Sequence, residues 1–192
     1  MALLTGFKKI KTAVFISGRG SNLKSLIKFS KLKKSPIIVK IIISNNSKSK
    51  GLQFAKTYKI KKKIFNFKNI LSENKAIYEL KKENINLICL AGFMKILSKS
   101  FIKNFKGKIL NIHPSLLPKY KGLNTHEKAI KNKDKYSGCT VHFVNSRLDS
   151  GKIINQKKVR INKLDTPQTL AKKILIQEHK LYRAAIMKIL SL

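Results

Sequence analysis

The chain has 192 residues, enough for one domain with a full hydrophobic core, since about 100 to 200 residues per domain is usual. Lysine and arginine total 43 against 8 acidic residues, a formal net charge of +35 that by itself suggests a nucleic-acid or anionic partner. Arginine occurs only four times, however, and the lysines are spread from end to end, whereas base reading favours clustered arginine. We interpret the charge as the coding bias of an A+T-rich genome and expect no specific nucleic-acid partner.

The cysteines and the apolar runs indicate the compartment. Cys89 and Cys139 lie in apolar runs without a CxxC pair or a metal-ligand spacing, so we expect buried free thiols in a reducing, cytoplasmic environment and no metal. Residues 1–6 are too short for the core of a signal peptide. The longest apolar run, residues 36–43, is interrupted by Lys40 and is far too short to span a bilayer, so no membrane association is expected.

The first predicted unit is a strand over residues 12–17, a glycine-rich turn, GRGSN, and a helix that begins near Leu23. The glycines allow close backbone approach, and Ser21 and Asn22 are predicted to cap the helix and leave N–H groups pointing outward, where a phosphate can bind. Leu23 stands where the dinucleotide fingerprint has a third small residue, so a phosphomonoester is favoured. The alternative is a glycine-rich helix start without a ligand.

Strand-like and helical stretches then alternate, as in βαβ units with a parallel sheet. Further strands are predicted at residues 36–43, 62–67, 87–91, 108–112, 137–144 and 153–161. Helices are predicted at residues 51–58, 72–83, 99–105 and 125–132, the second beginning at Ser72 and the last of these four with a cap. A final helix is predicted to have Thr166 as its N-cap and Pro167 as its first residue, and to end at about Leu190. No repeat or linker interrupts this order, so a single three-layer α/β domain over residues 1–192 is predicted.

Residues 93–98, FMKILS, are apolar where a loop should be polar. Two interpretations remain open from the residues alone. The segment either packs beneath the helix that follows it or lines an apolar pocket.

The strand at 108–112 leads into a candidate active-site turn. Asn111 and His113 are two residues apart, so the strand period directs both side chains the same way. Pro114 and Pro118 favour an ordered loop up to residue 122, and chemistry gathers on such loops at strand ends. The alternative is a satisfied histidine at the end of a strand.

With only eight acids, the position of each carboxylate is informative. Six fit local electrostatics on helices, caps or loops: Glu73, Glu79, Glu83, Glu127, Asp134 and Asp165. Asp149 and Glu178 fit less well. Asp149 either forms an Asx turn or has a function, and Glu178 either pairs with a lysine or has a function.

Five motifs together resemble the phosphoribosylglycinamide formyltransferase family, which acts in purine biosynthesis. They are ISGRGSNL (16–23), LAGFMKILS (90–98), NIHPSLLPKYKG (111–122), VHFVNSRLDSG (141–151) and QEHKLY (177–182). The resemblance spans nearly the whole chain in the same order. It implies a Rossmann-like, doubly wound, mostly parallel sheet with helices on both faces.

The resemblance also implies the reaction and its residues. The cosubstrate 10-formyltetrahydrofolate would donate its formyl group to the amine of glycinamide ribonucleotide, with no metal. Catalysis would fall to Asn111, His113 and Asp149. The ribonucleotide would contact Gly20, Ser21, Asn22, Gln177 and Glu178. The folate would contact Met94, Lys95, Ile96, Leu97, Asn111, Asn145, Ser146, Arg147, Leu148 and Asp149.

These residue types suit the chemistry. Asn111 and a protonated His113 can donate hydrogen bonds to the developing oxyanion, and Asp149 can keep the imidazole charged. Two positions depart from the family pattern: Lys95 replaces the usual Arg, which weakens any bidentate contact, and Arg19 lies between the two glycines of the turn.

Three other functions are alternatives to this one. Methionyl-tRNA formyltransferase and formyltetrahydrofolate deformylase share this fold but carry a further domain, for which 192 residues are expected to leave no room. An RNA-binding protein would explain the charge but predicts lysines on one face. The protein is expected to be a monomer or a homodimer.

Overall fold

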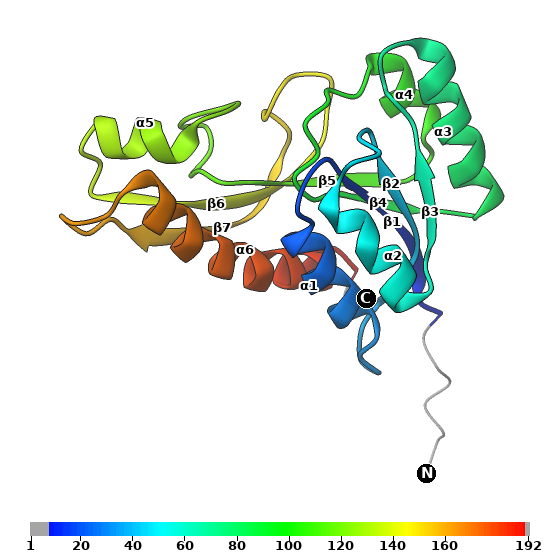
Figure 1. Cartoon of the computed structure of the whole chain (residues 1–192), viewed down its shortest axis with the longest axis horizontal. Helices are drawn as coiled ribbons and strands as arrows, with labels where there is room; N and C mark the ends of the chain where they lie inside the picture. Colours follow the sequence, from blue (N-terminus) through cyan, green and yellow to red (C-terminus); the bar gives the residue numbers. More distant parts are fainter. Residues whose placement is uncertain (1–7, 191–192) are drawn as a thin grey trace.

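Seven stretches of the chain form one sheet in the computed structural model, which describes residues 8–190 (Figure 1). The segment 1–6, considered above as a signal peptide, lies outside the described residues. The strands are β1 (Ile10–Ile16), β2 (Ile37–Ser44), β3 (Lys61–Ile64), β4 (Leu87–Leu90), β5 (Lys108–His113), β6 (Tyr136–Phe143) and β7 (Ile153–Arg160).

The strand order is β3-β2-β1-β4-β5-β6-β7. The first five strands are parallel, and β6 and β7 are antiparallel to their neighbours. The chain winds outward from β1 in one direction through β2 and β3, and in the other through β4 and β5. The predicted doubly wound, mostly parallel sheet is therefore confirmed.

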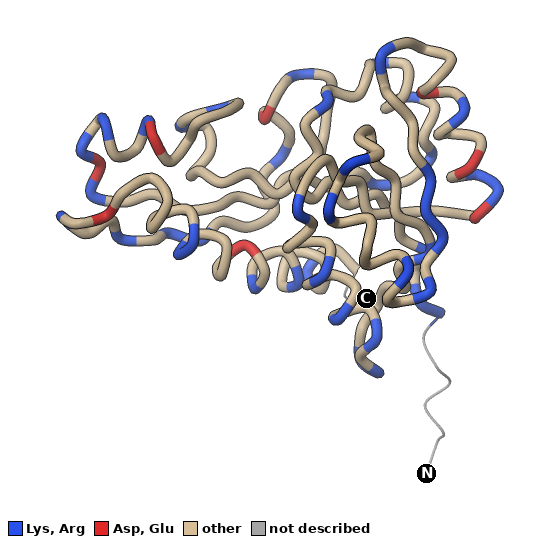
Figure 2. Tube along the Cα trace, viewed as in Figure 1, with Lys and Arg blue, Asp and Glu red and all other residues tan. Residues whose placement is uncertain are grey.

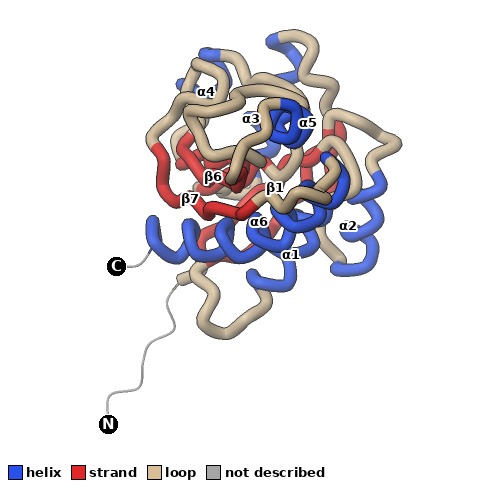
Figure 3. Tube along the Cα trace, turned by 90° about the vertical axis from the view of Figure 1, so that its left-hand side faces the viewer, coloured by secondary structure: helices blue, strands red, loops and turns tan. Residues whose placement is uncertain are grey.

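Helices cover both faces of the sheet (Figure 3). They are α1 (Ser21–Ser30), the 3-10 turn η1 (Lys50–Leu52), α2 (Gln53–Tyr58), α3 (Ile70–Lys82), α4 (Lys99–Asn104), α5 (Thr125–Lys131) and α6 (Pro167–Leu190). Helices α1 and α6 bury apolar side chains against one face, with Val14 and Ile16 of β1. Helices α3 and α4 pack on the other face, with Ala13 and Phe15 of the same strand. Alternate residues of one strand thus supply two separate cores.

Several helix starts differ from the prediction. Helix α3 begins at Ile70, before Ser72, because the Asn69 side chain accepts the Ser72 N–H at 3.0 Å and is the N-cap. Helix α1 has Gly20 as its N-cap, in the left-handed conformation, and no side-chain cap bond, so the predicted capping by Ser21 and Asn22 is wrong. The expected side-chain cap of α5 is also not formed.

One strand boundary also differs, whereas the start of the last helix agrees with the prediction. Strand β3 ends at Ile64, three residues before the predicted end. The predicted start of the last helix is confirmed, because Thr166 Oγ1 accepts the Thr169 N–H at 3.2 Å and Pro167 is the first helical residue. Both cysteines are buried free thiols, as predicted, and burial raises the pKa of each to about 12.

The parallel strands place the polar segments of the sequence at one edge of the sheet. The carboxyl ends of β1, β4 and β5 are adjacent, and each leads directly into a segment singled out above. In open α/β sheets, ligands bind outside the carboxyl ends of the strands, where the strand order reverses. That reversal lies between β1 and β4.

Candidate active site

Asn111, His113 and Asp149 come together at the end of β5. The Asp149 carboxylate lies 3.3 Å from His113 Nδ1 through Oδ2, and 3.4 Å from Asn111 Nδ2 through Oδ1. The predicted convergence of Asn111 and His113 is confirmed, and Asp149 reaches both from 36 and 38 residues further along the chain. The carboxylate is therefore more than part of a local Asx turn.

The Asp149 carboxylate is buried, with polar groups near both of its oxygen atoms. Gly122 N–H donates to Oδ2 at 2.9 Å, and His142 Nε2 lies 3.6 Å from Oδ1. Burial acts to raise the pKa of Asp149, but the approach of His142 and the Gly122 N–H outweigh it and hold the pKa below its ordinary value. The carboxylate is thus ionised at neutral pH.

His113 lies between two oxygen acceptors. Its Nε2 is 2.8 Å from the Tyr120 carbonyl oxygen and its Nδ1 faces Asp149. Burial lowers the pKa of His113 below its ordinary value and outweighs the Tyr120 carbonyl and the Asp149 charge, which act to raise it. The expectation that Asp149 keeps this imidazole charged is therefore wrong for the ligand-free protein.

His142 is a member of this cluster that the sequence reasoning missed. Its Nδ1 lies 2.8 Å from the Phe143 carbonyl oxygen, which can only accept, so the proton is on Nδ1. In the neutral ring Nε2 then accepts from Asn111 Nδ2 at 3.2 Å. The antiparallel register sets Asn111 directly opposite His142, and this register could not be read from the sequence of either strand.

A second polar group lies at the start of α1. Asn22 Nδ2 donates to Glu178 Oε2 of α6 at 2.7 Å, with both side chains buried. Burial raises the pKa of Glu178 above its ordinary value, against the opposing effect of Asn22. The suggested lysine partner for Glu178 is wrong. Gly20 and Ser21 precede Asn22 at the same helix start, and Gln177 is half-buried beside Glu178.

The segment after β4 combines the two interpretations left open above. Leu97 is 4% exposed and Phe93 packs against the core beneath α3 and α4, whereas Met94 and Ile96 are 64% and 69% exposed. Lys95 is also exposed. Leu97 can therefore meet a ligand only through its backbone, while Met94 and Ile96 present apolar side chains at the carboxyl edge of the sheet.

A second exposed segment leads to Asp149. Asn145, Ser146, Arg147 and Leu148 are all exposed, and the Asn145 side chain accepts the Arg147 N–H at 3.0 Å. Asp149 itself is buried, with a positive φ of 44°. The backbone thus turns at Asp149, so that the buried Asp149 carboxylate follows directly after four exposed side chains.

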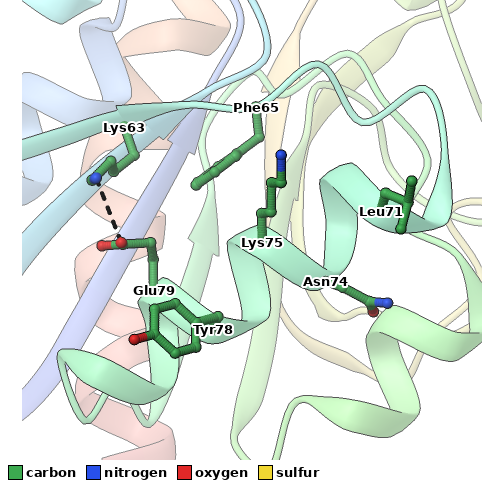
Figure 4. Close-up of a pocket in the computed structure, with 7 residues that line it drawn as sticks. All are labelled: Lys63, Phe65, Leu71, Asn74, Lys75, Tyr78 and Glu79. Carbon is green, nitrogen blue, oxygen red and sulfur yellow. Dashed lines mark ion pairs between the residues drawn. The ribbon is translucent and has the colours of Figure 1, made fainter.

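A hollow of about 440 Å³ lies elsewhere, between β3 and α3 (Figure 4). Phe65, Leu71 and Tyr78 give it an apolar lining, and Lys63 pairs with Glu79 across it at 3.5 Å. None of the predicted site residues lines it. Because it lies away from the polar clusters, we do not assign the chemistry to this hollow.

Residues 8–190 lack two kinds of feature. No group of three or more His, Cys, Asp or Glu in that range is arranged to hold a metal ion. No helix in the same part of the chain is long and apolar enough to cross a membrane.

The chain belongs to the formyl transferase family, whose sequence model matches residues 10–186. It is 43% identical over 180 residues to phosphoribosylglycinamide formyltransferase of Haemophilus influenzae, covering 92% of this chain and 85% of that protein. The crystal structure of phosphoribosylglycinamide formyltransferase from Anaplasma phagocytophilum superposes with a TM-score of 0.90 at 41% identity, over 96% of this chain and 88% of that chain.

A longer relative matches equally well. The chain is 42% identical over 188 residues to the human trifunctional purine biosynthetic protein adenosine-3. This match covers 96% of the chain but only 19% of that protein, so the chain spans about a fifth of the length of this trifunctional relative.

Proposed function

We propose that this protein transfers the formyl group of 10-formyltetrahydrofolate to the amine of 5-phosphoribosylglycinamide, giving formylglycinamide ribonucleotide and tetrahydrofolate in purine biosynthesis. The proposal is carried by the Asn111–Asp149–His113 cluster in a chain of the formyl transferase family. The free thiols Cys89 and Cys139 support a cytoplasmic location. We further propose that residues 1–192 act as a single domain, as a monomer or a homodimer.

In the proposed reaction the amine nitrogen attacks the formyl carbon. A new C–N bond forms, and the bond from that carbon to N10 of the folate breaks. The amine loses one proton and N10 gains one, so atoms and charge balance without a further reactant. Negative charge develops on the formyl oxygen, and this is the charge that the protein must stabilise.

Asn111 and His113 are the proposed donors to that oxygen. The Nε2–H of His113 donates to the Tyr120 carbonyl in the ligand-free protein, so the formyl oxygen has to replace this carbonyl as the acceptor. Asp149 stays ionised and faces Nδ1, where it stabilises the imidazolium that forms as the proton moves. His142 holds the Asn111 amide with its nitrogen toward the cluster.

The two exposed segments and the α1 start are the proposed binding surfaces. Backbone N–H groups of Gly20, Ser21 and Asn22 bind the ribonucleotide phosphate. Asn22 orients the Glu178 carboxylate, which with Gln177 binds the glycinamide end. The pterin lies between the segments 94–97 and 145–149, whose exposed apolar side chains include Met94, Ile96 and Leu148.

The experiment is an assay of purified protein with 10-formyltetrahydrofolate, with and without glycinamide ribonucleotide. We expect folate deformylation only when the ribonucleotide is present. Turnover without the ribonucleotide would instead indicate a deformylase, and formylation of methionyl-tRNA would indicate the tRNA enzyme.

The proposed catalytic roles are tested by three substitutions in the same assay. Asn111→Ala, His113→Ala and Asp149→Asn are each expected to lower kcat at least ~10²-fold, since each removes stabilisation of charge that exists only in the transition state. Thermal unfolding of each variant separates this loss from misfolding. A His113→Ala variant with near-normal kcat would contradict the mechanism.

A further inference from the structure

Three carboxylates among residues 8–190 are buried without a Lys or Arg partner. Glu73, Asp149 and Glu178 are 6%, 9% and 8% exposed, and the ion pairs that lysines form in this part of the chain use other acids. A buried charge is costly unless it is hydrogen-bonded, and this chain has 43 cations available. The proposed function uses Asp149 and Glu178 but leaves Glu73 unexplained.

Glu73 is bound to the segment that follows β4. Its Oε1 accepts the Ser98 backbone N–H at 3.0 Å, and its Oε2 accepts a short hydrogen bond from Ser98 Oγ. Ser98 Oγ in turn accepts the Phe101 N–H at 3.0 Å and is the N-cap of α4. Hydrogen bonds to an ionised acceptor are among the strong ones. Glu73 lies in the first turn of α3, which agrees with its predicted fit to local helix electrostatics, and it also forms hydrogen bonds to Ser98, 25 residues away.

We name residues 93–98 the donor loop, because the proposed function assigns them to the formyl donor. Its other end is held by Ser17, just after β1. Ser17 Oγ accepts the Met94 N–H at 2.7 Å and donates a short hydrogen bond to the Asn45 side chain. Both ends of the loop are thus bound by side chains from other elements, Ser17 at one end and Glu73 at the other.

Apolar contacts hold the same two ends. The Phe93 ring lies 5.3 Å from the Phe15 ring and 5.1 Å from the Phe67 ring, between centroids, in edge-to-face arrangements. Leu97, near the other end, is buried in the same core. Only the middle of the loop projects outward.

We propose that Glu73 and Ser17 are positioning residues for the formyl donor, which fix the donor loop in its binding conformation before the ligand arrives. The inference rests on the proposed function. Neither side chain needs to touch the folate: Glu73 acts through Ser98, and Ser17 acts through the Met94 backbone. A loop ordered in advance avoids the entropy cost of ordering it on binding, so the effect is expected in donor affinity and not in kcat.

The first test does not depend on the reaction. Hydrogen exchange of the donor-loop amides is measured in the ligand-free wild type and in Glu73→Ala, with Glu83→Ala as the matched control. Glu83 lies at the other end of α3 and pairs with Lys61 at 2.7 Å. We expect exchange at Ser98 and its neighbours to rise about tenfold in Glu73→Ala, the factor that corresponds to about 1.4 kcal/mol, and to stay unchanged in Glu83→Ala.

The second test is kinetic. Glu73→Ala is expected to raise KM for 10-formyltetrahydrofolate about tenfold, with kcat within about twofold and KM for glycinamide ribonucleotide unchanged. Glu73→Gln keeps an acceptor for the Ser98 N–H and should recover part of the loss. If Glu73→Ala does not fold, Glu73→Gln and Ser98→Ala are used in both tests, with smaller changes in the same direction.

Two results would overturn the inference: unchanged exchange in the donor loop, or equal changes in KM for both substrates. A wild-type protein that does not formylate the ribonucleotide would instead contradict the proposed function. In that case the exchange measurement still decides whether Glu73 holds the loop.

Discussion

His113 combines two properties that oppose one another. Both of its ring nitrogens face oxygen atoms, an arrangement that the doubly protonated ring satisfies best, yet burial lowers its pKa. The ring is therefore neutral at rest. The two oxygen acceptors can nevertheless stabilise the ring when it gains a second proton. This suits a group that becomes charged only while the formyl group is being transferred.

The lowered pKa of His113 predicts a pH dependence of stability. Below the ordinary value of 6.5 the unfolded chain binds more protons at this residue than the folded protein does. The contribution of His113 to the free energy of unfolding is thus present above that pH and is lost as the pH falls through the folded-state pKa. Urea unfolding from about pH 8 to pH 5 should show falling stability in the wild type.

The control for this prediction is His113→Gln, which should show a smaller fall over the same range. Some fall should remain, because burial also lowers the pKa of His126 and His179. Asp149, whose pKa is lowered, adds a loss of the same sign at more acidic pH. Identical slopes in the variant and the wild type would show that His113 does not titrate as described.

At the scale of the element, the glycine-rich turn is shaped by close backbone approach. Gly20 has φ +75°, and a Cβ there would lie 2.8 Å from Gly51 Cα, while a Cβ at Gly18 would meet nothing within 4 Å. Gly51 N–H donates to the Gly18 carbonyl at 3.0 Å, which joins the turn to η1. Only Gly20 of these two positions thus requires glycine.

Alanine substitution tests this difference. Gly20→Ala should lower the free energy of unfolding by at least about 1–2 kcal/mol, the cost of a left-handed conformation for a residue with a Cβ, and should weaken ribonucleotide binding. Gly18→Ala is the matched control, and it should change neither the free energy of unfolding nor ribonucleotide binding by much. Denaturant unfolding and KM for the ribonucleotide measure the two effects. Equal stability of the two variants would remove the steric argument.

The sequence predicted elements better than it predicted their contacts. A short apolar run such as the one in β4 indicates a strand from its own residues alone, because a strand that is buried on both faces consists of apolar side chains. Helix starts were less predictable, since Asn69 and Ser72 are both good caps, and in the structure it is Asn69 that caps α3. Glu73 and His142 were missed because their partners lie 25 and 31 residues away, and only the assembled sheet brings them together.

At the scale of the whole molecule, the cations surround the protein. Figure 2 shows Lys and Arg along helices, strands and loops in all parts of the trace. Within residues 8–190, acidic side chains form ion pairs with Lys61, Lys63, Lys119 and Lys173. This distribution supports the interpretation that the charge is compositional.

The compositional interpretation predicts that salt separates nucleic-acid binding from catalysis. Between about 50 and 200 mM salt, binding to tRNA or duplex DNA should be lost steeply and without sequence preference, because it rests on counterion release. The value of kcat should hardly change, since the proposed catalytic groups act at contact distance. A titration that follows both quantities tests this. An RNA that stays bound at the higher concentration with sequence preference would give the charge a selected function.

The excess lysine has one physical consequence at the two edge strands of the sheet. Strands β3 and β7 are the two edges, and each carries lysine: Lys61, Lys62 and Lys63 on β3, and Lys157 and Lys158 on β7. An unpaired strand edge is a template for aggregation, and lysine is the side chain that natural sheets most often place there to prevent it. Two copies that approached edge to edge would bring like charges together, so this composition opposes edge-to-edge pairing of two sheets.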